Sequence, residues 1–209
     1  MKLTWHGHAC FSLETSQGTI VVDPYPDNYV PGVGHVDAEA DVVFCSHQHN
    51  DHKAREVIRL TGRTPEFDVE QLHTFHDPEG GKLRGENIIH LFRVDGMKVA
   101  HCGDLGCDPA PELKEKLKDL DVMMIPVGGF YTINGAEAKT LIDELKPRVV
   151  VPMHYRSEKF GFGFDVIDTV EEFLKLCDNV VHYESNSLEV TKDTPVQVAV
   201  PAFMNPSIK

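Results

Sequence analysis

The stretch His47-Gln48-His49-Asn50-Asp51-His52 places three imidazoles and a carboxylate within six residues, directly after the apolar run 41–45. The β-branched and aromatic residues of that run predict a buried strand. The six polar residues then follow the strand end, where open α/β sheets place their ligands. Side chains two apart share a face of an extended chain, so His47 and His49 are predicted to bind one metal ion together. A turn beyond them directs Asp51 and His52 to a neighbouring position, which suits two metal ions. A polar loop with coincident histidines explains this spacing less well.

Two further aspartates follow predicted strands in the same way. Asp104 lies in Gly103-Asp104-Leu105-Gly106, just after the apolar run 97–102. The flanking glycines let the backbone approach an ion closely, and a carboxylate there can bridge two metal ions. Asp23 ends the predicted strand 18–22 and precedes a proline. A carboxylate at that place suits the acceptance of an N–H from a ligating histidine. A turn aspartate without such a role fits the same pattern.

The segment from Ser46 to His52 resembles the metal-binding motif of the metallo-β-lactamase superfamily. Other landmarks of that family occur in the matching order: Gly7-His8-Ala9, Val22-Asp23-Pro24, His76 in Phe75-His76-Asp77-Pro78, Asp104, Pro126-Val127-Gly128-Gly129-Phe130-Tyr131, and His154 in Pro152-Met153-His154-Tyr155. Over residues 2–156 the chain is similar to a branch of uncharacterised metal-dependent hydrolases related to the ascorbate-6-phosphate lactonases. The metal motifs are specific for the superfamily and say little about the substrate.

This resemblance implies an α/β fold, namely a four-layer αββα sandwich with the metal site at the edge between two mixed sheets. We expect residues 1–209 to form one such domain. The implied ligands of two divalent metal ions are His47, His49 and His76 for one ion, Asp51, His52 and His154 for the other, and Asp104 for both. The resemblance selects His76 over His73 as the third histidine. It also places His8 near the metals, where contact with substrate or with a ligand is favoured over direct metal binding.

The composition favours an acidic globular protein. The chain has 209 residues, 41% of them hydrophobic and 25% charged, which is ordinary for a soluble domain. Its net charge of −13 argues against a nucleic-acid surface, which needs basic residues, and bound cations can offset part of it. The five cysteines show no framework spacing, so disulfides are not expected. Without an apolar leader or an apolar run of about 20 residues, we expect a cytoplasmic protein that does not span a membrane.

The remaining pattern predicts alternating strands and helices. Strands are predicted over 3–13, 18–22, 71–75, 121–126 and 148–152, and two or three more over 180–200. The runs 88–94 and 97–102 are joined by Asp95-Gly96, a strong hairpin signal. Helices are predicted over 53–60, 111–120, 136–145 and 168–176. The helix over 53–60 would direct its N-terminus at the metals and attract anions.

Several residues are candidates for contact with the substrate. Tyr131 lies in the glycine-rich loop 127–134, which has no Walker lysine and so does not support a nucleotide-binding loop. Arg156 and Arg84 are candidates to bind a phosphate or carboxylate. The aromatic run Phe160 to Phe164 is compatible with a lid and equally with a loop packed on the core. Cys107 follows the Asp104 motif and is a weaker candidate for a ligand or functional thiol.

We hypothesise a hydrolase in which a hydroxide bridging two metal ions is the nucleophile. Imidazole and carboxylate ligands without cysteine favour Zn²⁺, with Mn²⁺ or Fe²⁺ as alternatives. Asp51 would bind metal, orient the water and take its proton, while Tyr131 and Arg156 would contact the substrate. The expected partner is a small, anionic molecule with an ester, lactone or phosphodiester bond, and a homo-oligomer is compatible with the sequence.

Three other functions remain open at this stage. A nuclease-like phosphodiesterase of this family usually carries an extra nucleic-acid-binding domain, which this acidic chain lacks. A di-iron or mono-iron redox protein, a persulfide dioxygenase or a thiolester hydrolase uses a similar ligand set. In flavodiiron relatives, however, a carboxylate replaces the second histidine of the motif, and here His49 is intact. A metal-storing module without turnover is the third alternative.

Overall fold

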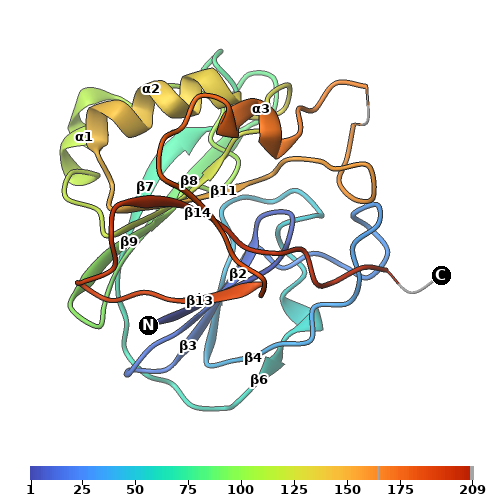
Figure 1. Ribbon diagram of the computed structural model, residues 1–209. Helices are drawn as coiled ribbons and strands as arrows, with labels where there is room; N and C mark the ends of the chain where they lie inside the picture. Colours follow the sequence, from blue (N-terminus) through green and yellow to red (C-terminus); the bar gives the residue numbers. More distant parts are fainter. Residues whose placement is uncertain (164, 208–209) are drawn as a thin grey trace.

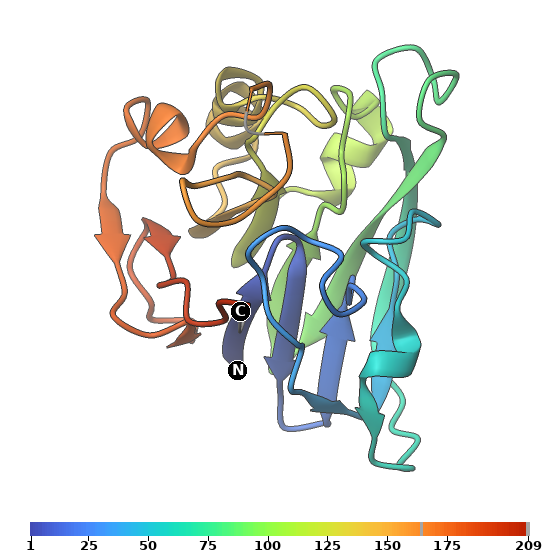
Figure 2. The same cartoon turned by 90° about the vertical axis from the view of Figure 1, so that its right-hand side faces the viewer.

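The computed structural model of the chain describes residues 1–163 and 165–207, and within them two large β-sheets face each other (Figure 1). The five-stranded sheet has the order β13 (Ser187–Glu189), β1 (Lys2–Gly7), β2 (Cys10–Glu14), β3 (Thr19–Val22) and β5 (Val42–Phe44). The seven-stranded sheet has the order β12 (Val180–His182), β14 (Gln197–Val200), β11 (Val149–Met153), β10 (Val122–Pro126), β9 (Met97–His101), β8 (Glu86–Val94) and β7 (Asp68–Phe75). A two-stranded ribbon joins β4 (Glu39–Ala40) to β6 (Arg59–Leu60). In Figure 2 the C-terminal strands and β7 lie on opposite sides of the molecule, as the strand order requires.

The core lies between the sheets and continues under the helices. Alternate residues of β1, such as Leu3 and Trp5, are buried because one face of that sheet meets the core. Strands β10 and β11 are buried along their whole length. Their second face is covered by α1 (Pro111–Lys116), α2 (Gly135–Leu145) and α3 (Val170–Leu174), which lie together on one side of the sheet (Figure 1). One hydrophobic cluster connects residues of both sheets.

The predicted fold class is confirmed, and both sheets mix parallel with antiparallel neighbours. The layer beyond the five-stranded sheet, which was expected to be helical, is thin. Within the described ranges that side has no α-helix, and the ribbon β4–β6 lies there (Figure 1). None of the helices in these ranges is long and apolar enough to cross a membrane.

The helix predicted over 53–60 does not form. A short 3₁₀ helix, η1 (Arg55–Val57), is followed by β6. The backbone N–H of Arg59 donates to the carbonyl of Ala38 at 3.2 Å, and that of Thr61 donates to Ala40 at 3.0 Å. A helix of eight residues is marginal by itself, so pairing with β4 decides the conformation. The expected helix N-terminus beside the metals is therefore absent from this described segment.

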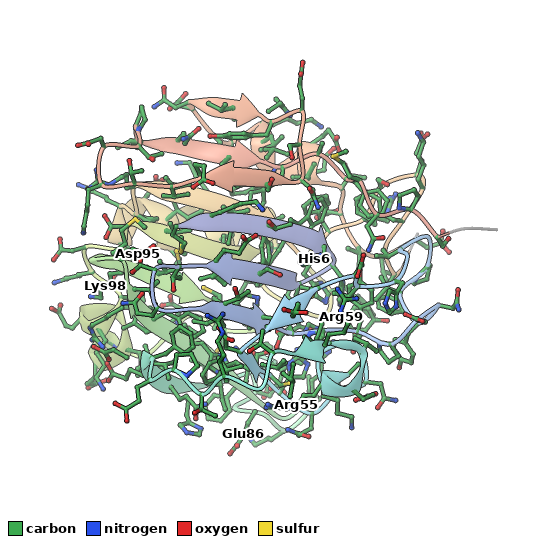
Figure 3. All side chains as sticks on the ribbon, turned by 90° about the horizontal axis from the view of Figure 1, so that it is seen from below. His6, Arg55, Arg59, Glu86, Asp95 and Lys98 are labelled. Atoms are coloured by element: carbon green, nitrogen blue, oxygen red, sulfur yellow. The ribbon has the colours of Figure 1, made fainter. Side chains whose placement is uncertain are left out.

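The hairpin signal and the helix predicted over 136–145 match the structure, whereas the helices predicted over 111–120 and 168–176 are shorter, as α1 and α3. Asp95 and Gly96 both have positive φ, 50° and 70°, and they join β8 to β9 as the hairpin signal predicts. Helix α2 begins with Asn134, whose side chain accepts two backbone N–H bonds in a capping box. The single strand expected over 3–13 is instead two antiparallel strands, β1 and β2, with His8 in the turn at φ 52°. In Figure 3, Asp95 lies at the end of the N-terminal strands opposite to His6.

Candidate metal centre

Strand direction brings the predicted site residues to one edge. Strands β1, β3 and β5 run the same way, because β2 is antiparallel to both of its neighbours and β3 is parallel to β5. In the other sheet β7, β9, β10 and β11 share a direction for the same reason. The predicted site residues all follow the C-terminal ends of these strands: His8 after β1, Asp23 after β3, the segment 47–52 after β5, His76 after β7, Asp104 after β9 and His154 after β11.

The side chains gather into two adjacent groups, and a third group of Asp23, His47 and His52 overlaps both. The ligand atoms of His47, His49 and His76 lie within 4.8 Å of one another. Those of His8, Asp51, His52 and His154 form the second group by the same measure. These two groups contain every predicted metal ligand except Asp104.

Asp104 lies between the two groups. Its Oδ2 atom is 3.1 Å from Nε2 of His76 and 3.8 Å from Nε2 of His47, both in the first group. The same oxygen is 3.2 Å from Nε2 of His52 and 3.2 Å from Nε2 of His154, both in the second group. One carboxylate oxygen therefore faces four imidazole nitrogens, two from each group.

These distances suit a divalent metal. Two ligand atoms bound tetrahedrally at about 2.0–2.1 Å from an ion are about 3.3 Å apart, close to the contacts around Asp104. Among the described residues, Nε2 of His47, Nε2 of His52 and Oδ1 of Asp104 are buried and have no hydrogen-bond partner. Buried polar atoms rarely stay unpaired, so an ion explains their arrangement. The residues present fit a metal centre.

The charge of the site favours a cation as well. Burial by itself would lower the pKa of His52, but the carboxylates of Asp104 and Asp23 hold it well above its usual value. Burial would likewise raise the pKa of Asp104, yet the imidazoles of His154 and His52 hold it well below the usual value. No lysine or arginine of the described chain forms an ion pair with these aspartates. Positive charge is needed at this place, and a divalent ion supplies it.

Asp23 occupies the supporting position that the sequence suggests. Its Oδ2 atom lies 2.9 Å from Nδ1 of His52, which leaves Nε2 of that histidine for the site. Ser46 donates its backbone N–H to Oδ1 and its hydroxyl to Oδ2 of Asp23, both at 2.6 Å. The Ser46 hydroxyl also lies 2.9 Å from Nδ1 of His47. One buried aspartate therefore orients a histidine of each group, the second one through Ser46.

His8 contacts the predicted ligand Asp51 and belongs to one of the groups that could hold an ion. Its Nε2 atom lies 3.2 Å from Oδ2 of Asp51, and its ring contacts that of His154 in a tilted arrangement, with centroids 4.4 Å apart. Burial lowers the pKa of His8 to about 4. His8, Asp23 and His154 all have φ between 51° and 52°. Non-glycine residues rarely adopt this conformation, and its concentration in one site is typical of functional residues.

The extended conformation predicted for 47–49 is wrong. The segment after β5 is bent rather than extended, so period-two alternation does not explain why His47 and His49 meet. Their rings instead contact nearly at right angles, with centroids 4.6 Å apart. The glycines beside Asp104 have a further role, because their lack of a side chain lets neighbouring chain segments pack closely. A Cβ atom at Gly103 would lie 2.5 Å from Cβ of Ser46, and one at Gly106 would lie 2.2 Å from the backbone of His76.

A cavity of about 540 Å³ opens onto the two groups, within the usual range for small-molecule sites. Its metal-site wall consists of His49, Asp51, His76, Asp104 and His154, and its remaining wall of Tyr29, Gln48, Asn50, Leu83, Arg84, Tyr131 and Phe162. Tyr131 and Arg84 are thus placed where contact with a substrate is feasible. The aromatic residues Tyr29 and Phe162 add an apolar side, to which the aromatic run Phe160 to Phe164 contributes Phe162.

Other candidates lie away from the cavity. Arg156 donates its Nε–H to the carbonyl of Ile167 at 2.6 Å and is not among the lining residues, so its predicted contact with the substrate gains no support. The Cys107 thiol contacts the carbonyl of Phe75 and belongs to neither described group. His73 is exposed on β7, which agrees with the choice of His76. Phe160 packs in the core and Phe162 lines the cavity, whereas Phe164 lies outside the described residues.

Two supporting residues were missed. The buried Asn87 accepts the backbone N–H of Asp104 at 3.0 Å and donates to the carbonyl of Cys102 at 2.9 Å, which fixes the strand end that carries Asp104. Asp77 accepts four backbone N–H groups from the loop that follows it. An aspartate opening the run Asp77-Pro78-Glu79-Gly80-Gly81 signals a turn, but the signal does not reveal how many bonds it accepts.

Comparison with known proteins places the chain in a family. A family model described as a β-lactamase superfamily domain matches residues 2–154. A UPF0173 metal-dependent hydrolase of Methanoculleus marisnigri is 32% identical over 188 residues, which cover 74% of this chain and 81% of that protein. One from Natranaerobius thermophilus is 28% identical over 188 residues, which cover 75% and 84% of the two chains.

A solved structure resembles this one closely. It is that of a Thermotoga maritima protein whose name proposes a Zn-dependent hydrolase of the metallo-β-lactamase superfamily. It has a TM-score of 0.73 and 36% sequence identity, over 96% of this chain and 97% of that chain. The matched family model spans most of the sequence, including both groups of histidines and Asp104. The chain therefore belongs to the metallo-β-lactamase superfamily.

Proposed function

We propose that the protein is a metal-dependent hydrolase of small molecules and that its site holds two divalent metal ions. The observation that carries this proposal is the position of Asp104, whose Oδ2 atom faces Nε2 of His76 and His47 on one side and Nε2 of His52 and His154 on the other. The names of the Methanoculleus and Natranaerobius relatives support a metal-dependent hydrolase. The N and O donor set favours Zn²⁺, with Mn²⁺ and Fe²⁺ as alternatives.

When bound, a pair of such ions would activate a water and polarise the bond to be cleaved. Asp51 is the proposed base. It lines the cavity, and it stays ionised at neutral pH because the hydrogen bond with His8 and the charge of His52 outweigh burial and hold its pKa well below the usual value. A carboxylate in this place can orient a water and accept its proton.

The cavity wall supplies the remaining contacts. Tyr131 is about one-third exposed and reaches the cavity from the loop after β10, so its hydroxyl is the proposed donor to the oxygen that gains charge. The substrate is an ester, a lactone or a phosphodiester of small size, and a lactonase-like activity is one form of this proposal. We further propose that the protein acts in the cytoplasm on its own or as a homo-oligomer, without nucleic acid.

The test begins with protein purified without added metal. Its metal content is measured, and the same preparation is assayed on lactone, ester, thiolester and phosphodiester panels before and after chelation. We expect about two divalent ions per chain and activity that is lost on chelation and restored by the metal. Activity that survives complete chelation contradicts the proposal, and an iron content with redox turnover would favour an iron-dependent oxidase or dioxygenase.

Asp51→Asn separates an enzyme from a metal-storing module. The amide keeps the size of the side chain but accepts a proton poorly, so we expect the rate to fall by about 100-fold or more. Metal content should fall far less than the rate. Equal losses of metal and rate would show that Asp51 serves only as a ligand.

A further inference from the structure

The loop Asp77–Gly85 connects a metal-site histidine to the rim of the cavity. It follows His76 directly, and its shape is set by the buried carboxylate of Asp77. Oδ1 of Asp77 accepts N–H groups of Glu79 and Gly81 at 2.8 and 3.0 Å. Oδ2 accepts those of Leu83 and Arg84 at 3.0 and 2.8 Å. Asp77 is fully buried, and four backbone N–H groups converge on its two carboxylate oxygens, so this side chain anchors the loop.

The loop closes back onto its start. The N–H of His76 donates to the carbonyl of Gly85 at 3.0 Å, and the N–H of Gly85 donates to Gly81 at 3.0 Å. The side chain of Arg84 is therefore attached to a rigid backbone at a defined distance from His76. A side chain held in this way is suited to recognise a group on a substrate bound at the metals.

The Arg84 guanidinium lies near two aromatic rings, Phe130 and Tyr131, which are perpendicular to each other. Its Cζ atom is 5.8 Å from the ring centroid of Phe130 and 5.7 Å from that of Tyr131. Contact with a ring face leaves the N–H donors of a guanidinium available, because those donors lie on its edge. Within the described parts of the chain, no acceptor forms a hydrogen bond or ion pair with this side chain. Arg84 is also the one lysine or arginine among the described residues that line the cavity.

Arg84 puts a positive charge on the cavity wall of a chain whose net charge is −13. Two divalent ions would bring four positive charges to the cavity floor, and Asp51 and Asp104 would offset two of them. Arg84 adds a separate positive charge at the rim. A substrate with one negative charge near the metal ions and a second near Arg84 would complement both positive charges. A guanidinium binds a carboxylate or a phosphate through two N–H donors at once.

We infer that Arg84 selects substrates with a second oxyanion group, a carboxylate or a phosphate, set apart from the bond that is cleaved. The connecting part of the substrate lies against Leu83 and Tyr131. Asp77 is a positioning residue that holds Arg84 in place. The inference rests on the proposed hydrolase function, and it narrows the substrate class from small esters, lactones or phosphodiesters to those with this additional charge.

Two esters of equal length test the inference. Mono-4-nitrophenyl glutarate carries a terminal carboxylate, and 4-nitrophenyl valerate is its neutral counterpart. We expect metal-loaded wild-type protein to prefer the glutarate ester. Arg84→Met should lower kcat/KM for the glutarate ester by about tenfold or more and change the valerate ester by less than threefold. Arg84→Lys keeps the charge but not the fork, so it should restore part of the preference.

The control is Arg93→Met. This exposed arginine on β8 forms ion pairs with Asp68 and Glu70, so its replacement removes the same charge far from the cavity. It should leave the preference for the glutarate ester unchanged. A loss of the preference in this variant, or an equal effect of Arg84→Met on the two esters, overturns the inference while the hydrolase function stands.

Binding to chelated, metal-free protein gives a readout that does not depend on hydrolysis. Phenylphosphonate and glutarate are titrated separately and followed by ligand-detected NMR, and the tighter of the two identifies the preferred oxyanion. Arg84→Met should weaken that binding at least fivefold, and Arg93→Met should not. If wild-type protein hydrolyses neither ester, the proposed function loses its support, and this titration still decides the role of Arg84. Equal binding by wild-type protein and Arg84→Met contradicts the inference.

Discussion

The Oδ2 atom of Asp23 lies 2.9 Å from Nδ1 of His52, and both side chains are fully buried. This contact fixes which nitrogen of His52 faces the metal site. Asp23→Asn replaces the acceptor by an amide, and partners of this kind change metal affinity by about 10- to 100-fold. We expect a loss of that size in a competition titration with a fluorescent chelator. Asp27→Asn, at an exposed aspartate of the neighbouring loop, should leave the affinity unchanged. Unaltered affinity in Asp23→Asn would show that packing alone orients His52.

The shared position of Asp104 predicts how metal stoichiometry responds to single substitutions. His49 belongs to one group and His154 to the other, whereas Asp104 contacts both. His49→Ala and His154→Ala should therefore each leave about one ion per chain, and Asp104→Ala should retain less than one. Elemental analysis of proteins purified in parallel checks this order. Two ions retained in Asp104→Ala would contradict a bridging role.

From the burial of His90 we predict that the folded protein becomes less stable in acid. His90 is completely buried and packs against Phe44 and Phe92, and burial lowers its pKa from 6.5 to about 4. The unfolded chain therefore binds a proton between those pH values that the folded chain does not, so stability falls as pH falls through this window. Through His90, the free energy of unfolding should be about 2 kcal/mol lower at pH 5 than at pH 8.

Urea unfolding of chelated protein at pH 8 and pH 5 measures this contribution. In His90→Leu the difference between the two pH values should shrink by about 2 kcal/mol. The same substitution at His182, which is exposed on β12, should leave the difference at the wild-type value. An unchanged difference in His90→Leu would mean that His90 is not the source of the acid sensitivity.

From the position of Gly128 we predict that a substitution in the loop after β10 disturbs the metal site. A Cβ atom at this position would lie 2.2 Å from the carbonyl oxygen of His154, so Gly128→Ala must displace the backbone that carries the histidine. We expect a loss of about 3 kcal/mol in unfolding free energy, together with reduced metal content. Gly62→Ala is the control, because nothing lies within 4 Å of its Cβ position and only its positive φ resists alanine. That strain costs about 1 kcal/mol and should leave metal content unchanged.

The local signals in the sequence were sufficient for many elements. Asp95-Gly96 needs no distant partner to form a tight turn, and Asn134 with Glu137 caps α2 from within four residues. The helix predicted over 53–60 does not form because the helical pattern there is weak and the segment pairs with the backbone of β4 instead. The sequence therefore predicts an element well where the deciding contacts are local, and poorly where a remote strand competes.

For the site, the sequence by itself determined the chemistry: which imidazoles and carboxylates follow the ends of strands, and that their number suits two ions. Only the tertiary structure decided their arrangement. It placed Asp104 between the groups, joined Asp23 to a histidine of each, kept Arg156 out of the cavity and set Arg84 on its rim. The physical reason is that residue types are local properties of the chain. Distances between residues far apart in sequence depend instead on sheet order and loop packing, which the whole core determines at once.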